Sequence, residues 1–331
     1  MFQGKFQEYD KKYCCLACFP VRKYHCGVFF DLITPAVNKY LSGALNGLKK
    51  IGLIVKEDVE AINQADKFEA WLVAKGVAVI RWNIEWPDRA NAEYGLSCAS
   101  AELYCVFALG GDGTFLSAVR WIGDQEIPIL GVKFGELGFL AETDENSLLR
   151  VGEAVLKGAF KTRPRMRLQV KIDRNGKEIS KETVLNDVVI NRGASSHLAH
   201  IQTYIDEHFL TEYRADGLIV STPTGSTAYS LAAGGPIVHP GVNSILLSPI
   251  CPFTLTNRPL LVPDSVRIKI QLAESSDAIV TFDGQAVCEI DEGDVITIQK
   301  GNHPIHVITL LDHDDYFDLL KTKLRWSGSR V

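Results

Sequence analysis

The sequence predicts a two-domain protein, with an α/β domain built on a mostly parallel sheet and a β-rich domain after it. A length of 331 residues is enough for two domains of ordinary size. Up to residue 160, apolar runs of strand length alternate with stretches of helical spacing, which is typical of a parallel sheet with helices on both faces. Beyond it, many short runs alternate with period two, as in antiparallel sheets. We therefore expect an α/β domain over 48–160 and a β-rich domain over 161–310.

The α/β domain is expected to begin with the short apolar run that follows the basic pair at 49–50, which is typical of a buried strand. A helix is expected over 58–75, because apolar residues recur on one side of it at Ala61, Ala65, Phe68 and Leu72. The remaining expected elements are strands at 77–80, 103–109 and 127–132 and helices at 115–122 and 148–156.

In the β-rich domain, alternating runs at 168–172 and 266–270 are examples of the expected strands. The Asn-Gly pair within 174–177 predicts a tight turn between two of them. The tail, 311–331, carries Tyr316, Phe317, Leu320 and Leu324 at helical spacing, which indicates a C-terminal helix that packs back on the fold.

Residues 1–47 follow neither pattern and are set apart as an N-terminal extension. Four cysteines crowd its first 26 residues, including Cys15 and Cys18 in a Cys-x-x-Cys pair. Zinc could use such ligands, but the second pair lacks the spacing of a zinc ribbon or finger, so no metal site is predicted. One hypothesis is that the true chain begins near Leu45 or Leu48 and that the upstream segment is an over-extended start.

The amino-acid composition indicates a globular protein and argues against some kinds of partner. Hydrophobic residues make up 46% and charged residues 23%, as in globular proteins. A net charge of −5 argues against a nucleic-acid or anionic-membrane partner. No stretch approaches the ~20 apolar residues of a membrane span, and the charged start is unlike a secretory signal, so a cytoplasmic protein is expected. Cys105 and Cys288 are expected to be buried thiols of a reducing compartment.

The first chemical motif is Gly-Gly-Asp-Gly-Thr at 110–114, between an expected strand and an expected helix. A helix start offers phosphate its free N–H groups, and glycines let the backbone approach closely or adopt left-handed conformations. Asp112 stands where a carboxylate could meet a hydroxyl or a magnesium ion. The alternative is a tight turn with a helix-capping aspartate. The motif fits neither a Walker loop nor a dinucleotide fingerprint, so it indicates another sort of phosphate handling.

The second motif spans 216–236 and consists of Asp216-Gly217, a β-run, the hydroxyl-rich string 222–230 and a Gly-Gly-Pro turn. A short helix is expected at about 226–233. Hydroxyls and amides at a helix start suit a phosphorylated or ribose-bearing ligand, although a plain helix cap would use the same residue types.

The third motif is Asn186-Asp187 within an apolar strand, 185–190. Burying these side chains without partners is costly. The amide could pair with a base edge and the carboxylate with ribose hydroxyls. The alternative is a pair that bonds its own backbone where the strand begins.

Together these motifs resemble the NAD kinase family. Residues 110–114 resemble its GGDGT motif, Asn186-Asp187 its Asn-Glu/Asp motif, and 216–236 its glycine-rich signature, residue for residue over 222–229. The loop 135–142, Asn257-Arg258-Pro259 and Asp283-Gly284-Gln285 also follow in the family's order. The resemblance covers roughly 48–325. Many relatives have Glu at the position of Asp187, and the shorter arm alters the reach to the ribose.

The resemblance implies a Rossmann-like N-terminal domain, a β-rich C-terminal domain, NAD bound between them, and a homodimer or homotetramer. It implies that Asp112 is the catalytic carboxylate near the reacting 2′-hydroxyl. It also implies a set of residues that bind the dinucleotide or line the same site: Gly111, Gly113, Thr114, Phe139, Asn186, Asp187, Thr224, Thr227, Ala228 and Tyr229.

Two further residues are carried over by position. Asp216 would reach the nicotinamide side, and the resemblance implies that it does so across a subunit interface. Arg214, two positions earlier, would help to bind phosphate.

The residue chemistry agrees with this implied reaction, the Mg²⁺-dependent transfer of the γ-phosphate of ATP to the 2′-hydroxyl of the adenosine ribose of NAD. A ribose hydroxyl is a poor nucleophile, and a positioned carboxylate can accept its proton, an effect of ~10²–10⁴-fold. Phosphoryl transfer otherwise depends on alignment and on charge stabilisation, usually by Mg²⁺. Asp112 could bind the metal instead of the proton, and the sequence leaves both roles open, as it does polyphosphate as donor and NADH as acceptor.

Two other classes of protein share features of these motifs. Lipid kinases and phosphofructokinases have a similar glycine–aspartate turn, but the acidic charge balance and the string 222–229 argue against them. A non-catalytic NAD(H) sensor would retain Asn186 and Tyr229, and the presence of Asp112 argues against that reading.

Overall fold

A computed structural model describes residues 49–83, 99–134, 138–141, 143–193, 198–274, 278–310 and 316–326. All of these belong to the unit Gly43–Val331. The cysteine cluster and the hypothesis about the start of the chain fall outside them, as do residues 135–137 and 142 of the loop 135–142.

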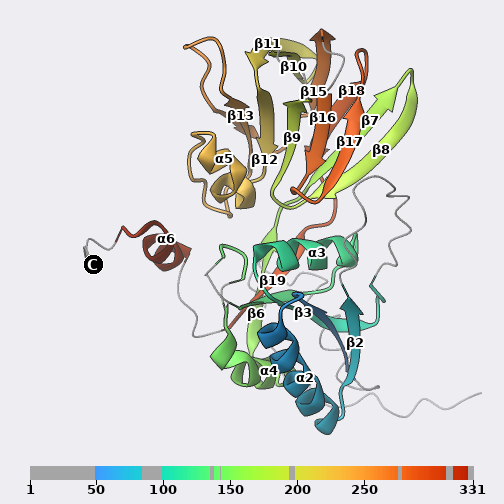
Figure 1. The fold of residues 1–331 in the computed structure, drawn as a ribbon, viewed down its shortest axis with the longest axis vertical. Helices are drawn as coiled ribbons and strands as arrows, with labels where there is room; N and C mark the ends of the chain where they lie inside the picture. Colours follow the sequence, from blue (N-terminus) through green and yellow to red (C-terminus); the bar gives the residue numbers. More distant parts are fainter. Residues whose placement is uncertain are drawn as a thin grey trace, which may run out of the picture. The chain divides into compact units, whose positions relative to one another are not determined.

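The α/β part is built on a seven-stranded sheet with the order β2-β1-β3-β4-β19-β6, in which β5 also pairs with β4 (Figure 1). Its neighbouring strands are parallel except for β19 and β6. The mostly parallel sheet expected from the sequence is therefore confirmed. Its strands are β1 Lys50–Val55, β2 Ala78–Asn83, β3 Leu103–Leu109, β4 Ile129–Lys133, β5 Thr143–Asp144, β6 Phe160–Arg165 and β19 Ile305–Leu310.

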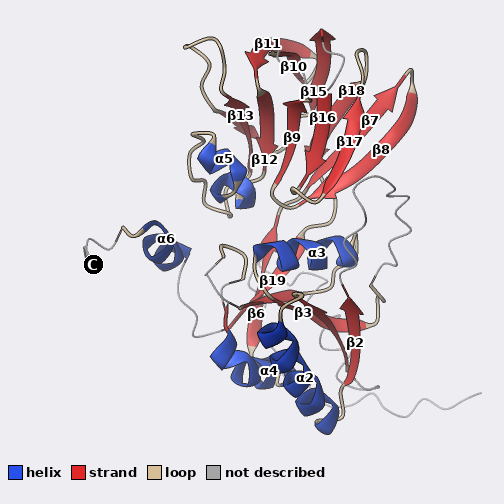
Figure 2. Cartoon of the chain, in the orientation of Figure 1, coloured by secondary structure: helices blue, strands red, loops and turns tan. Residues whose placement is uncertain are grey.

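Helices cover both faces of this sheet (Figure 2). Helices α2 (Val59–Ala74) and α4 (Leu148–Leu156) share an apolar core with one face, and α3 (Asp112–Ile122) shares a second core with the opposite face. Asp58 caps α2 by accepting hydrogen bonds from the N–H groups of Glu60 and Ala61, and the four apolar residues expected on one side of this helix are buried. No helix in the described part of the chain is long and apolar enough to cross a bilayer.

Helix α3 begins at Asp112, three residues before the predicted start at 115. The prediction was late because the first turn holds Asp, Gly and Thr, which give no apolar period. This first turn matters because it places the Gly-Gly-Asp-Gly-Thr motif on the helix start itself.

The β-rich part consists of two six-stranded antiparallel sheets with the orders β11-β10-β15-β18-β7-β8 and β14-β13-β12-β9-β16-β17. Apolar residues from both sheets form one buried cluster, so the two sheets pack face to face. The strands are β7 Leu168–Arg174, β8 Lys177–Val184, β9 Asp187–Arg192, β10 Ala199–Ile205, β11 His208–Ala215, β12 Gly217–Ser221, β13 Ser244–Ile250, β14 Leu260–Pro263, β15 Ile268–Glu274, β16 Ala278–Phe282, β17 Ala286–Ile290 and β18 Val295–Lys300.

Two strands from the range 161–310 pair outside these antiparallel sheets. β6 and β19 join the seven-stranded sheet, where Val307 of β19 lies opposite Ile129 of β4 (Figure 1). Period-two alternation identifies a strand but not its partner, so the sequence could not assign them. The chain therefore passes from the α/β part to the β-rich part after β6 and returns to the α/β part at β19.

Other expectations have definite outcomes. The turn at 174–177 places Asn175 and Gly176 at positive φ, as an Asn-Gly hairpin requires. The C-terminal helix α6 spans Tyr316–Leu324, and Tyr316 packs against the ring of His239 at 5.0 Å. Cys105 is buried as expected, whereas Cys288 is only half-buried because it lies on the edge strand β17.

Candidate active site

Asp112 connects the start of α3 to the loop 138–141. Its carboxylate accepts hydrogen bonds from the backbone N–H groups of Phe139 at 2.8 Å, Leu140 at 2.9 Å and Ala141 at 3.2 Å. A Cβ on Gly138 would lie 1.8 Å from its Oδ1 atom, so only glycine fits there. The carboxylate is half-buried and held in one orientation, as a catalytic group needs to be.

The glycines around Asp112 leave room beside it. A Cβ on Gly111 or on Gly113 would meet no atom within 4 Å, and neither residue has a positive φ. The left-handed conformations suggested for these glycines are therefore absent. Their missing side chains instead keep the backbone at the helix start open to a ligand, which suits a phosphate. Thr114 is different, because it is buried and a Cβ on Gly110 would lie 2.3 Å from its Oγ1 atom.

Asn186 is buried directly before β9 and has an unsatisfied side chain. Its Oδ1 atom has no hydrogen-bond partner among the described residues. Its backbone is fully engaged, with the N–H donating to Asp283 at 2.7 Å and the carbonyl accepting from Thr222 at 2.9 Å. A buried acceptor without a donor is destabilising unless a ligand supplies one.

Asp187 and Asp283 bring two buried carboxyl groups together beside Asn186. Burial, together with the smaller effect of the neighbouring Asp283, raises the pKa of Asp187 to about 7. Burial also raises the pKa of Asp283, to about 6, against the effect of three backbone N–H donors. Because these donors stabilise the charged form of Asp283, Asp283 is the carboxyl that ionises first.

The string 222–230 folds over Asn186. It forms a 3-10 turn, Thr224–Thr227, and the short helix α5, Tyr229–Ala232. The short helix expected at about 226–233 is confirmed only over 229–232, because the non-helical backbone of Ala228 separates it from the preceding turn. A Cβ on Gly225 would lie 2.1 Å from the carbonyl oxygen of Asn186, which shows how closely the turn and the strand approach.

The hydroxyl groups of this string mostly stabilise the loop. Thr222 donates to the carbonyl of Leu185 at 2.5 Å, and Ser226 donates to that of Pro223 at 2.6 Å. Thr227 donates to the carbonyl of the buried Thr224 at 3.2 Å. The groups that remain accessible are half-buried Thr227 and Ala228 and the ring of Tyr229, which is 46% exposed.

Arg214 and Asp216 lie elsewhere. Asp187 is opposite Ser221 in the sheet, whereas Asp216 precedes the other end of β12. Five residues of strand separate them, a length of about 17 Å. Asp216 forms an ion pair with Arg192 at 2.7 Å, and the exposed Arg214 lies over the ring of Phe253. Within one chain the structure does not bring these two residues to Asn186.

Two residues that were not predicted as site residues connect the parts of the site. The Nε2 atom of Gln285 donates to the carbonyl oxygen of Gly113 at 2.9 Å and to the Oγ atom of Ser117 at 3.1 Å. Asp283 holds the Asn186–Asp187 backbone, as described above. The only sequence signal was that Asp283-Gly284-Gln285 falls in the order of the resembling family.

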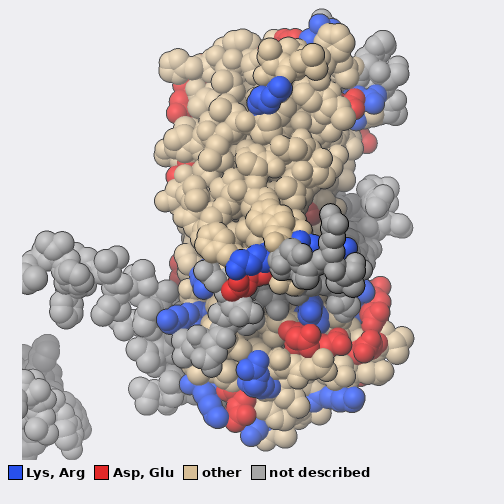
Figure 3. Space-filling view, turned by 90° about the vertical axis from the view of Figure 1, so that its left-hand side faces the viewer, with Lys and Arg blue, Asp and Glu red and all other residues tan. Residues whose placement is uncertain are grey.

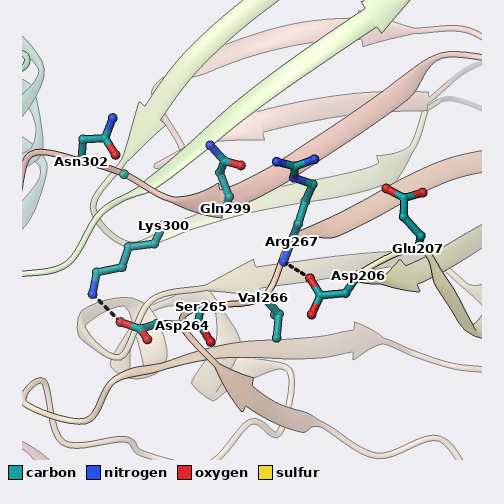
Figure 4. A pocket seen from close by; sticks show the side chains of 10 residues that line it. Asp206, Glu207, Asp264, Ser265, Val266, Arg267, Gln299, Lys300 and Asn302 are labelled. Atoms are coloured by element: carbon teal, nitrogen blue, oxygen red, sulfur yellow. Dashed lines mark hydrogen bonds and ion pairs between the residues drawn. The ribbon is translucent and has the colours of Figure 1, made fainter.

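A groove elsewhere in the described part of the chain is not this site. It has a volume of about 720 Å³ and is lined by turns at 206–207, 264–267 and 299–302 of the β-rich part. In this groove Lys300 forms an ion pair with Asp264, and the backbone N–H of Arg267 donates a hydrogen bond to Asp206 (Figure 4). None of the predicted site residues lines it, so we do not assign the chemistry to it.

The open, glycine-flanked helix start beside an oriented carboxylate indicates a class of protein that handles phosphate groups. The comparisons with known proteins identify its family. The ATP-NAD kinase N-terminal domain matches residues 51–160, and the ATP-NAD kinase C-terminal domain matches residues 185–310. The chain belongs to the ATP-NAD kinase family.

Individual proteins that are similar to this chain are named NAD kinase or NADH kinase. The NAD kinase of Desulfatibacillum aliphaticivorans is 53% identical over 285 residues, which cover 86% of this chain and 100% of that protein. The NAD kinase of Geotalea daltonii is 41% identical over 291 residues, covering 84% and 99%. Yeast NADH kinase, solved in complex with NADH, is 28% identical with a TM-score of 0.76 and covers 87% of this chain and 90% of its own. An Archaeoglobus fulgidus NAD kinase in complex with ATP, 23% identical with a TM-score of 0.64 and coverages of 84% and 100%, supports the fold.

Proposed function

We propose that this chain transfers the γ-phosphate of ATP to the 2′-hydroxyl of the adenosine ribose of NAD, with Asp112 as the proton acceptor. The observation that carries the proposal is the contact of Gln285 with Gly113. It joins the helix start that bears the reactive carboxylate to the turn that holds the adenosine-binding segment. The contact would thereby position acceptor and base in one site, and such alignment is the main requirement of phosphoryl transfer.

The phosphoryl transfer forms one bond to the γ-phosphorus and breaks another. The 2′-oxygen forms a bond to the γ-phosphorus while the bond from that phosphorus to the β,γ-bridging oxygen breaks, so that ADP leaves. The proton of the 2′-hydroxyl passes to Asp112. The open backbone at Gly111 and Gly113 and the start of α3 would receive phosphate oxygens, with Thr114 and Phe139 lining the same space.

The adenosine part would be held by the other side of the site. The unsatisfied Oδ1 atom of Asn186 suits an amino or hydroxyl donor of the ligand, and the carboxyl group of Asp187 suits ribose hydroxyls. The accessible groups of Thr227, Ala228 and Tyr229, together with Thr224, would line the dinucleotide pocket.

Magnesium would arrive with ATP as part of the substrate. Among the described residues there is no group of three His, Cys, Asp or Glu side chains that could hold a metal ion. The oxygens of Asp112 already accept three N–H groups. A few protein ligands and the substrate phosphates are a common way to hold Mg²⁺, which here would neutralise charge on the transferring phosphate.

We further propose a homodimer or homotetramer, in which a second copy brings Arg214 and Asp216 to the site. The β-rich part shows a broad surface with few charged side chains (Figure 3). Large apolar side chains exposed in the segment 242–261 are Val242 at 44%, Phe253 at 69%, Leu255 at 86% and Leu261 at 46%. Exposed apolar patches of this kind are typical of protein interfaces. The free thiols Cys105, Cys251 and Cys288 fit a reducing, cytoplasmic compartment. The net charge of −5 disfavours nucleic acid or an anionic membrane as a partner.

The reaction is tested by incubating the full chain with NAD⁺, ATP and Mg²⁺ and identifying the product by ³¹P NMR. A new monoester phosphate on the 2′-oxygen of the adenosine ribose supports the proposal. Intact NAD⁺ binding with no transfer from ATP would contradict it and would favour a sensor. Phosphate on another acceptor position would contradict the assigned geometry.

A further inference from the structure

We propose that the turn Asp283–Gln285 is a positioning device that holds the acceptor-binding segment and the catalytic helix in a fixed position relative to each other. Asp283 orients Asn186 and Asp187, and Gln285 sets the first turn of α3. The identity of the chemical groups that the turn aligns rests on the proposed function. The hydrogen bonds of Asp283 and Gln285 do not depend on it.

Asp283 organises the backbone of three successive residues. Its Oδ2 atom accepts from the N–H of Leu185 at 2.8 Å, and its Oδ1 atom accepts from those of Asn186 at 2.7 Å and Asp187 at 3.1 Å. In return, the N–H of Asp283 donates to the carbonyl of Asp187 at 2.9 Å. A carboxylate that gathers consecutive N–H groups is a strong, charge-assisted anchor. It fixes the orientation of the two side chains that would hold the adenosine.

Gln285 acts at the other end of the same turn. Its amide donates to the carbonyl of Gly113 and to the hydroxyl of Ser117, and that hydroxyl donates to the same carbonyl at 3.1 Å. The three groups close a triangle one residue after Asp112. The contact spans 172 positions of sequence, so it is not part of the local structure of α3.

The backbone of the turn is tight. Asp283 has a φ of 49° and Gly284 a φ of 66°, and Gln285 donates its N–H to the carbonyl of Phe282 at 2.9 Å. These are the features of a tight hairpin turn with both central residues in the left-handed region, for which Asp-Gly is a preferred pair. The turn therefore fixes the backbone positions of Asp283 and Gln285 relative to each other.

A separate anchor holds the opposite end of α3. The guanidinium of Arg167 is buried and donates to the carbonyl of Gly123, which ends the helix, at 2.7 Å and to that of His303 at 2.6 Å. Arg167 precedes β7, so residues from the β-rich part of the chain hold both ends of α3. Loss of Gln285 would therefore release the first turn while the helix as a whole stays docked.

The positioning role predicts a kinetic signature. In Gln285→Met the side chain keeps its length and loses its donors, so we expect kcat to fall about tenfold or more while the KM for NAD stays within about twofold. In Asp283→Asn one N–H loses its acceptor, so we expect the KM for NAD to rise about tenfold. Gln299→Met is the matched control, because Gln299 bonds only Gln169 among the described residues, away from the site, and its kcat should not change.

A second measurement separates this proposal from the proposed function. Amide hydrogen exchange at 115–118, the first protected amides of α3, should be faster in Gln285→Met and unchanged in Gln299→Met. If the unsubstituted chain forms no NADP⁺, the proposed function fails, and the exchange rates still decide the positioning role. Gln285→Glu keeps the shape and puts an acceptor against the Gly113 carbonyl, so it replaces Gln285→Met if that variant does not fold. Wild-type kcat together with wild-type exchange in either variant would overturn the proposal, as would equal losses in the Gln299→Met control.

Discussion

The backbone of Gly225 lies against the carbonyl of Asn186 so closely that a Cβ on Gly225 would stand 2.1 Å from that oxygen and 2.5 Å from its carbon. The obstacle is backbone rather than the end of a flexible side chain, so it cannot move aside alone. The loop that carries Thr227, Ala228 and Tyr229 is thereby held against the segment that carries Asn186 and Asp187.

Gly225→Ala should consequently damage both the fold and the site. We expect a loss of about 1–3 kcal/mol in the free energy of unfolding, the usual effect of overpacking, together with weaker NAD binding. Urea unfolding and calorimetric titration with NAD measure the two effects. Wild-type stability in this variant would show that the two segments do not approach as closely as described.

Gly111→Ala should behave in the opposite way. No atom lies within 4 Å of the added Cβ and the φ is −96°, so the free energy of unfolding should change by less than about 0.5 kcal/mol. The methyl group would occupy the open space beside the start of α3, so the KM for ATP should rise. An unchanged KM for ATP would remove Gly111 from the phosphate site.

The carboxyl of Asp187 should make stability depend on pH. Its folded-state pKa of about 7 lies above its ordinary value, so the folded protein binds the proton more tightly than the unfolded chain does. The stability contribution is then complete below about pH 4 and is lost as the pH rises through 7. Relative to Asp187→Asn, the free energy of unfolding of the unsubstituted chain should fall by about 2–3 kcal/mol between pH 5 and pH 8. Parallel curves for the two proteins would contradict the buried, neutral carboxyl.

The interface between copies should contain the exposed apolar side chains of the segment 242–261, which are Val242, Phe253, Leu255 and Leu261. Leu255 is 86% exposed, so Leu255→Asp should leave the fold intact and lower the mass measured by light scattering after gel filtration. The control is Leu149→Asp, at a leucine of α4 that is 51% exposed on the α/β part. A wild-type mass for Leu255→Asp would place the interface elsewhere or leave the chain monomeric.

The parts of the fold that followed from the sequence are those whose signal is local. The apolar period of α2, the run of β3 and the Asn-Gly turn at 175–176 were all readable within a few residues. The pairing of β19 with β4 was not, because alternation carries no information on the partner. The start of α3 was placed late since Asp112, Gly113 and Thr114 have no apolar period.

The candidate site shows the same limit. Asp112, Asn186 and Asp187 were singled out because polar residues in apolar surroundings are unusual and fit a motif. The groups that orient them act across the sequence, and Gly138, Asp283 and Gln285 gave no pattern of their own. Asp112 contacts a loop about 27 positions away, and Gln285 contacts Gly113 across 172. Such contacts depend on the folded topology, which local periodicity does not determine.

The central claim is that Asp112 receives the proton of the 2′-hydroxyl. The most direct measurement is the kcat for NADP⁺ formation by Asp112→Asn at saturating NAD⁺ and MgATP, with the Kd for NAD⁺ measured in parallel. Asparagine can still accept from Leu140 and Ala141, so we expect the variant to fold and to bind NAD⁺ within about threefold of the unsubstituted chain, while kcat falls about 10²–10⁴-fold. Asp58→Asn, which changes a cap on α2 to another good capping residue, should keep full activity. Near-normal turnover by Asp112→Asn would contradict the account.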